Sequence, residues 1–128
     1  MKVLIVDENP ADLLMQADLL ALKGFTVTHA RSAVDGMKSI TTENPDLVIA
    51  DVMPYDATYE DPNAMLRAMA TIYDLPMIAV SYSVKTDRAT GTERLGCIGL
   101  IAKPINTRTY ADDVLKLWES CAAAQGGR

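Results

Sequence analysis

Three acids, one hydroxyl and one ammonium lie at the ends of short apolar runs that are far apart in the sequence. Asp7 and Glu8 follow the first run, Asp51 ends the third, Ser81 ends the fourth and Lys103 follows the fifth. If these runs are parallel strands of one sheet, their carboxyl ends meet at one edge, where open α/β sheets bind ligands. The sequence therefore predicts a single site that contains all five side chains.

Three carboxylates in one place predict a bound cation, because like charges raise one another's pKa and disfavour the ionised form. Oxygen ligands suit Mg²⁺ or Mn²⁺, whereas zinc would favour His or Cys. A phosphoryl group has the charge and the oxygens that the metal, the Lys103 ammonium and the Ser81 hydroxyl could hold together. Asp51 is the central carboxylate and hence the candidate nucleophile, and its attack on phosphorus would give an acyl phosphate.

Runs rich in Val and Ile alternate with stretches of helical period along the whole chain. This alternation is typical of a parallel sheet that is covered by helices on both faces. We expect five strands, at residues 2–7, 25–30, 46–51, 76–81 and 98–103. The second strand alternates apolar and polar residues, which predicts an edge strand, and the other four are expected to be buried.

Capping residues indicate where the helices begin. Asn9-Pro10 and Gly24 bound a first helix over 10–23, and Ser32 with Asp35 resembles a capping box before the second. A third helix is expected after Asp61-Pro62, a fourth within 84–95 that contains Thr and Gly and is the least stable, and a fifth over 107–123. Ala33, Met37 and Ile40 fall on one face of the second helix, and Met65, Met69 and Ile72 have helical spacing in the third. The fifth helix is expected to bury Tyr110, Val114, Leu117 and Cys121 along one stripe.

Composition limits the class of protein. The chain has 128 residues with a net charge of −5, which is enough for one domain and offers no basic footprint for nucleic acid. The apolar run 3–6 is too short for a signal peptide and no run could span a bilayer, so we expect a cytoplasmic protein without membrane insertion. Cys97 and Cys121 have no metal-binding spacing and are expected to be small buried hydrophobes. We expect one domain over 1–124 and a flexible tail over 125–128.

Four motifs, in this order, resemble the response-regulator receiver family of two-component signalling. They are Val-Asp7-Glu8, the run 46–51 that ends in Asp51, Val80-Ser81, and Ala102-Lys103-Pro104. Each motif is weak alone, but the set has the intervals of the family and covers nearly the whole chain. The resemblance implies an α/β fold with a five-stranded parallel doubly wound sheet, the flavodoxin-like strand order 2-1-3-4-5, and helices on both faces.

The resemblance also implies a role for each predicted site residue. A divalent metal would be held by the carboxylates of Asp7, Glu8 and Asp51 and by the backbone carbonyl of Met53. Asp51 would accept a phosphoryl group from a histidine kinase or phosphotransfer protein, and Ser81 and Lys103 would bind the phosphoryl oxygens. Such a domain is a phosphoacceptor with at most weak self-catalysis, not an enzyme. The peptide bond before Pro104 would be cis.

The resemblance further implies an output protein or domain that binds the fourth helix, fifth strand and fifth helix. Three features depart from the family pattern. The interval from Asp51 to Pro54 is one position short, Leu100 replaces the usual aromatic switch residue, and the bulky Tyr82 follows Ser81. Tyr82 is then the candidate for coupling the site to the output surface. A degenerate receiver that binds a partner without phosphorylation stays open as the alternative.

Two other classes of α/β protein fit the sequence poorly. A flavodoxin-like electron carrier would need a glycine- and hydroxyl-rich phosphate loop after the first strand, and residues 8–11 are Glu-Asn-Pro-Ala. A phosphatase of the haloacid type would need an acid two positions after its nucleophile, where this chain has Met53. His29, on the expected edge strand, is predicted to be solvated. Trp118 is expected to pack the last helix against the sheet or a neighbour.

Overall fold

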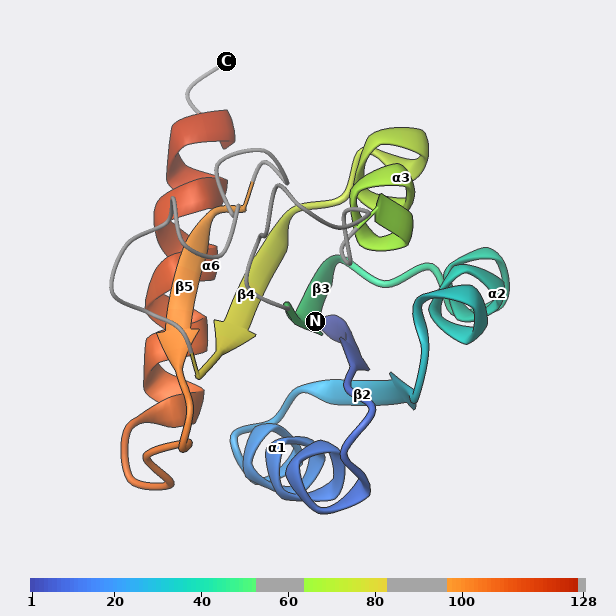
Figure 1. Ribbon diagram of the computed structural model, residues 1–128. Coiled ribbons are helices and arrows are strands. Elements are labelled where there is room, and N and C mark those ends of the chain that lie inside the picture. The colour runs from blue at the N-terminus through green and yellow to red at the C-terminus, as the bar shows by residue number, and fades with distance from the viewer. Residues whose placement is uncertain (53–63, 83–96, 127–128) are drawn as a thin grey trace.

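A parallel sheet forms the centre of the molecule, and helices cover both of its faces (Figure 1). The computed structural model describes residues 1–52, 64–82 and 97–126. Within these residues the strands are β1 (Lys2–Val6), β2 (Thr26–Ala30), β3 (Leu47–Asp51), β4 (Met77–Ser81) and β5 (Gly99–Ala102). The helices are α1 (Pro10–Leu22), α2 (Ala33–Glu43), α3 (Ala64–Tyr73) and α6 (Tyr110–Gly126).

The strand order is β2-β1-β3-β4-β5, and every neighbouring pair is parallel, as the resemblance implied. The register pairs Val6 with Ala50 and Asp51 with Val80. It also pairs Ser81 with Ala102. The carboxyl ends of β1, β3, β4 and β5 therefore lie side by side, and this alignment places the predicted site residues at one edge of the sheet.

Two apolar cores lie on the two faces of the sheet. Successive side chains of a strand point to opposite faces, so Leu4 and Val6 of β1 join one core while Val3 and Ile5 join the other. The helices α2 and α3 cover the first core, and α1 and α6 cover the second (Figure 1). Trp118 packs against the second core, as expected for a residue that fixes the last helix to the sheet.

The helix starts agree with the predicted caps. The Asn9 side chain accepts hydrogen bonds from the backbone N–H groups of Ala11 and Asp12, and Ser32 accepts one from the N–H of Asp35. Gly24 has a φ of 101°, a left-handed conformation that favours glycine after the end of α1. The last helix begins three residues later than expected, at Tyr110, and continues to Gly126.

The helical spacing of Met65, Met69 and Ile72 does not coincide with the buried face of α3. Met69 is buried, but Met65 is 45% exposed and Ile72 is 64% exposed, while Leu66 is buried instead. Tyr73 packs partly against the same core, so the stripe runs through 66, 69 and 73. Both stripes have helical spacing and share Met69, and spacing alone does not choose between them because apolar residues occur on most sides of this helix.

The expectation that four strands are buried was wrong for β5. This strand is the second edge of the sheet, and only Ile101 of its four residues is buried. His29 is exposed on β2, at the opposite edge, as predicted. Cys97 and Cys121 are each partly buried.

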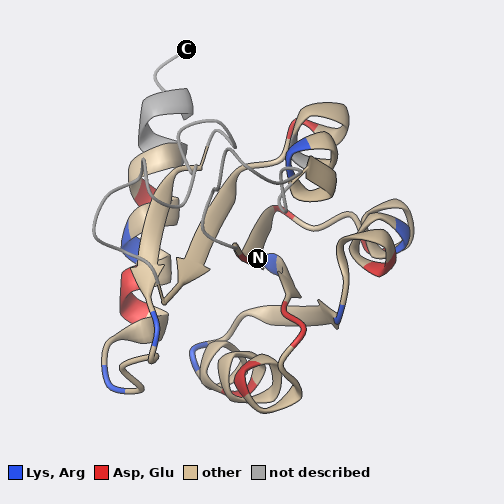
Figure 2. Cartoon of the chain, in the orientation of Figure 1, with Lys and Arg blue, Asp and Glu red and all other residues tan. Residues whose placement is uncertain are grey.

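Several predictions fall on residues that the structure does not describe. They concern Met53, the Asp61-Pro62 cap and the helix expected within 84–95. None of the helices in the described ranges has the length and hydropathy that crossing a bilayer requires. Figure 2 shows Lys and Arg spread over several elements, and an acidic segment where the chain leaves β1 at Asp7 and Glu8.

Candidate functional site

Lys103 lies among three carboxylates at the carboxyl edge of the sheet. Its Nζ is 2.8 Å from Asp7 Oδ2, 3.1 Å from Asp12 Oδ2 and 3.3 Å from Asp51 Oδ1. An ammonium group has three protons, so one lysine can face all three acids. The side chains of Lys103 and Asp7 are 2% and 1% exposed, whereas those of Asp12 and Asp51 are 20% and 24% exposed. The cluster is therefore closed on the side of Asp7 and open to solvent at Asp51.

The strands bring these residues together, as the sequence predicted. Asp7 follows β1, Asp51 ends β3 and Lys103 follows β5. The backbone N–H of Lys103 donates to the carbonyl oxygen of Ser81 at 2.8 Å, which ties the end of β5 to the end of β4. The Lys103-Pro104 peptide bond is cis, as the resemblance implied.

Burial and charge set the protonation of this cluster. Burial raises the pKa of Asp51 and the neighbouring Asp7 carboxylate raises it further, while Lys103 offsets only part of the effect. Burial alone would lower the pKa of Lys103, but the hydrogen bonds to Asp7 and Asp12 outweigh it, so its pKa is raised. Lys103 therefore stays charged at neutral pH, and three acids share one base.

Asp7 is the most constrained of the three acids. Its Oδ1 accepts a hydrogen bond from the backbone N–H of Asn9 at 2.9 Å. Its Oδ2 accepts one from Lys103 Nζ at 2.8 Å and one from Gln16 Nε2 at 3.1 Å. Gln16 in turn accepts a hydrogen bond at Oε1 from the Tyr110 hydroxyl at 2.8 Å. A buried chain of polar groups thus joins the site to α1 and to the first residue of α6.

The comparison with protein families decides the class. Residues 3–114 match the family model for the response regulator receiver domain. The chain belongs to this family. Receiver domains are phosphoacceptor modules of two-component signal transduction rather than classical enzymes.

Related proteins agree with this assignment. The receiver domain is 24% identical over 116 residues to the polar-differentiation response regulator DivK of Brucella ovis, which covers 88% of this chain and 91% of the relative. A CheY-like receiver structure from Methanospirillum hungatei JF-1 has a TM-score of 0.74 at 24% identity, with 92% of this chain and 94% of that chain covered. Chemotaxis protein CheY4 of Vibrio cholerae has a TM-score of 0.77 at 19% identity, with 91% and 97% covered. At these identities the solved structures show a common fold.

The other predicted site residues of the receiver domain lie around the cluster. Glu8 is exposed beside Asp7, and Ser81 is buried at the end of β4. Tyr82 is 66% exposed, and the centroid of its ring is 5.5 Å from Lys103 Nζ, within the range of a cation–π contact. Leu100 packs against the core of α2 and α3. Tyr82 is thus an aromatic residue in contact with the lysine.

Sequence reasoning missed Asp12 and Gln16 as site residues and treated Tyr110 only as part of the core. Asp12 is hidden because an acid in the first turn of a helix is already explained by the helix dipole. Gln16 does carry a signal, since it lies between Leu13 and Leu20 on the buried stripe of α1. An amide at an apolar position predicts a buried hydrogen-bond partner.

The predicted metal site includes three carboxylates among the described residues, whereas Met53 lies outside them. In the ranges that the structure describes, no group of three or more Asp, Glu, His or Cys side chains could hold a metal ion. The cluster of acids predicts that a cation neutralises them. Lys103 supplies part of that positive charge. The carboxylates of Asp7, Glu8 and Asp51 are hard oxygen donors, the type that Mg²⁺ prefers. Their chemistry therefore fits Mg²⁺, although the lysine now occupies two of them.

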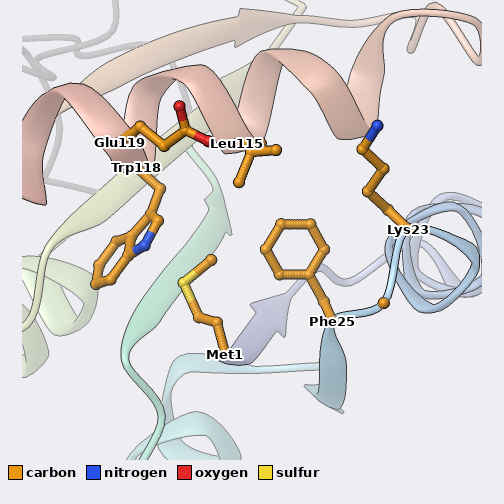
Figure 3. Close-up of a pocket in the computed structure, with 7 residues that line it drawn as sticks. Met1, Lys23, Phe25, Leu115, Trp118 and Glu119 are labelled. Atoms are coloured by element: carbon orange, nitrogen blue, oxygen red, sulfur yellow. The ribbon is translucent and has the colours of Figure 1, made fainter.

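An apolar pocket of about 320 Å³ lies away from this site, between Met1 at the start of the chain, the turn that follows α1, and α6 (Figure 3). Its lining consists of Met1, Lys23, Gly24, Phe25, Leu115, Trp118 and Glu119. No acid, lysine or hydroxyl of the predicted site lines it. This pocket is therefore separate from the cluster of Asp7, Asp12, Asp51 and Lys103.

Proposed function

We propose that this receiver domain is a phosphorylation-dependent switch that accepts a phosphoryl group on Asp51 in a Mg²⁺-dependent reaction. The observation that carries the proposal is the position of Asp51, which is partly exposed at the end of β3 with its Oδ1 3.3 Å from Lys103 Nζ. A carboxylate in this position can be reached by a phosphoryl donor and has the Lys103 ammonium beside it. Membership of the receiver family supports the same role.

In the proposed reaction a carboxylate oxygen of Asp51 attacks phosphorus, and the bond from phosphorus to the donor breaks as the new oxygen–phosphorus bond forms. The donor leaves with the electron pair of the broken bond. Bound Mg²⁺ would be held by Asp7, Glu8 and Asp51 and would neutralise charge on the phosphoryl oxygens. Lys103 and the hydroxyl of Ser81 would bind these oxygens from the neighbouring strands.

Lys103 must change partners for this to happen. Its ammonium now has Asp7, Asp12 and Asp51 as neighbours, so an incoming phosphoryl group competes with carboxylates for the same protons. The phosphoryl group carries more negative charge than one carboxylate, which favours the exchange. Movement of Lys103 would pull on the end of β5 and change the contact with Tyr82. We propose that this movement transmits the signal to an output surface that includes β5 and α6.

The donor would be a histidine kinase or a phosphotransfer protein, as the receiver family implies. A second candidate function is a binding module that works without phosphorylation. The observation that favours it is the closed arrangement of Lys103, which already has three carboxylate partners. The two functions differ in whether Asp51 becomes modified.

Intact mass measurement after incubation with Mg²⁺ and acetyl phosphate separates the two functions. The wild type is expected to gain the mass of one phosphoryl group, and Asp51→Asn is expected to gain none. The matched control is Asp18→Asn, which changes an exposed acid on α1 and should be modified like the wild type. A folded wild-type protein that gains no mass in the presence of Mg²⁺ would establish the binding module instead.

A further inference from the structure

A chain of hydrogen bonds links Asp7 to the first residue of α6 through the protein interior. The Tyr110 hydroxyl donates to Gln16 Oε1 at 2.8 Å, and Gln16 Nε2 donates to Asp7 Oδ2 at 3.1 Å. The side-chain amide of Gln16 also donates to the carbonyl oxygen of Asp12 at 3.1 Å. Gln16 and Tyr110 are each 1% exposed, so water does not compete for these bonds.

The chemistry of the neighbours fixes the orientation of the Gln16 amide. Its NH₂ end faces a carboxylate oxygen of Asp7 and the backbone carbonyl of Asp12, which are both acceptors. A flipped amide would place its own oxygen against both of them. Burial raises the pKa of Tyr110, so its hydroxyl keeps its proton and remains the donor to Oε1. Both amide hydrogens and the amide oxygen of Gln16 are therefore used.

Within the described part of the chain, the hydrogen bonds to Asp7 leave it with one available position for a further partner. Each carboxylate oxygen can accept about two hydrogen bonds. Among bonds from described residues, Oδ2 already accepts from Lys103 and from Gln16, whereas Oδ1 accepts only from the backbone N–H of Asn9. The remaining lone pair of Asp7 is on Oδ1. If Lys103 turns away from Asp7, Gln16 is the side chain that still holds Oδ2.

Core packing does not explain why Gln16 and Tyr110 are polar. Gln16 shares the buried stripe of α1 with Leu13 and Leu20, and Tyr110 shares a core with Val114. Apolar side chains would fill both positions without the cost of burying an amide and a hydroxyl. Besides the backbone carbonyl of Asp12, the polar pair is oriented toward the Asp7 carboxylate.

We propose that Gln16, oriented by Tyr110, is a positioning residue that keeps Asp7 turned with Oδ1 toward Mg²⁺ while Lys103 moves to the phosphoryl group. This inference rests on the proposed function, because it assigns a role within that same site. It predicts that metal affinity depends on two residues that do not touch the metal. Partners that hold a metal ligand in place typically change affinity by about 10-fold or more when they are removed.

The test is calorimetric titration of Mg²⁺ into the metal-free protein, with folding of each variant checked by circular dichroism. Gln16→Leu removes the bond to Asp7 and is expected to weaken Mg²⁺ binding about 10-fold. Tyr110→Phe removes a single hydroxyl, leaves the core filled, and is expected to weaken binding by a smaller factor. The double variant should bind no more weakly than Gln16→Leu, because Tyr110 acts through Gln16.

The matched control is Tyr73→Phe, which removes a hydroxyl from a partly buried tyrosine on the opposite face of the sheet. It should bind Mg²⁺ like the wild type. If Gln16→Leu and Tyr110→Phe lower the unfolding midpoint but keep wild-type affinity for Mg²⁺, the pair is merely structural and the inference is overturned. If Gln16→Leu does not fold, Tyr110→Phe alone decides. A folded wild type that binds no Mg²⁺ would overturn the proposed function and this inference together.

Discussion

Removing the positive charge of Lys103 should destabilise the domain strongly. Lys103→Met keeps the apolar stem and leaves Asp7, Asp12 and Asp51 without their shared cation. At an effective dielectric constant of about 20, unit charges separated by 2.8 to 3.3 Å attract by about 5 to 6 kcal/mol before desolvation is counted. Folding of the variant no longer requires the desolvation of an ammonium group, but it leaves buried acids without their cation. Removing one partner of a buried ion pair lowers the free energy of unfolding by about 3–5 kcal/mol.

Urea unfolding followed by circular dichroism, in buffer without divalent ions, measures this loss. The matched control is Lys23→Met, because Lys23 pairs with Asp112 at the surface, where the two side chains are 42% and 53% exposed. Its unfolding midpoint should change little, since exposed ion pairs contribute little. The deficit of Lys103→Met should shrink as the pH falls and Asp51, whose pKa is raised by burial and by Asp7, becomes protonated. A Lys103→Met variant that loses no more stability than Lys23→Met would refute the electrostatic account of the cluster.

Three further changes test other parts of the structure by urea unfolding. Burial and Asp7 raise the folded-state pKa of Asp51, so its ionisation costs stability as the pH rises above the unfolded value. Asp51→Asn should therefore be more stable than the wild type at neutral pH without divalent ions, and this advantage should vanish in acid. Gly99→Ala would place a Cβ 2.5 Å from Leu117 Cδ2 and should cost about 1–3 kcal/mol, unless Leu117→Ala is also present. Asn9→Ala removes the cap of α1 and should cost about 1 kcal/mol. If Gly99→Ala has the stability of the wild type, the packing of Gly99 against Leu117 is contradicted. If Asn9→Ala has the stability of the wild type, the cap of α1 is contradicted.

The sequence allowed most of the sheet and the convergence of Asp7, Asp51 and Lys103 to be predicted. Parallel strands carry their carboxyl ends to one edge, so residues that follow such strands must meet there. The starts of α1 and α2 could be predicted because capping side chains bond to backbone N–H groups only a few residues away. Such signals are local, or they follow from topology alone.

Features that depend on side-chain geometry could not be predicted. The position of Lys103 between Asp7 and Asp12 depends on where the first turn of α1 lies relative to the end of β5. The buried face of α3 depends on how that helix rotates against the sheet, and its sequence is apolar on most sides. The contact between Gln16 and Tyr110 joins two elements far apart in the sequence, and neither residue indicates its partner.

The hydrogen bond from Tyr110 to Gln16 spans 94 positions of the chain, which has a consequence for synthesis. All of β1 to β5 leaves the ribosome before α6 does, so a nascent chain can hold the strand ends together before Tyr110 can reach α1. Gln16 then lacks the hydroxyl that fixes its amide, although Asn9 and Lys103 can already contact Asp7. Docking of the last helix supplies that hydroxyl. The support that Gln16 and Tyr110 give to Asp7 is thus completed last, after the strand ends have met.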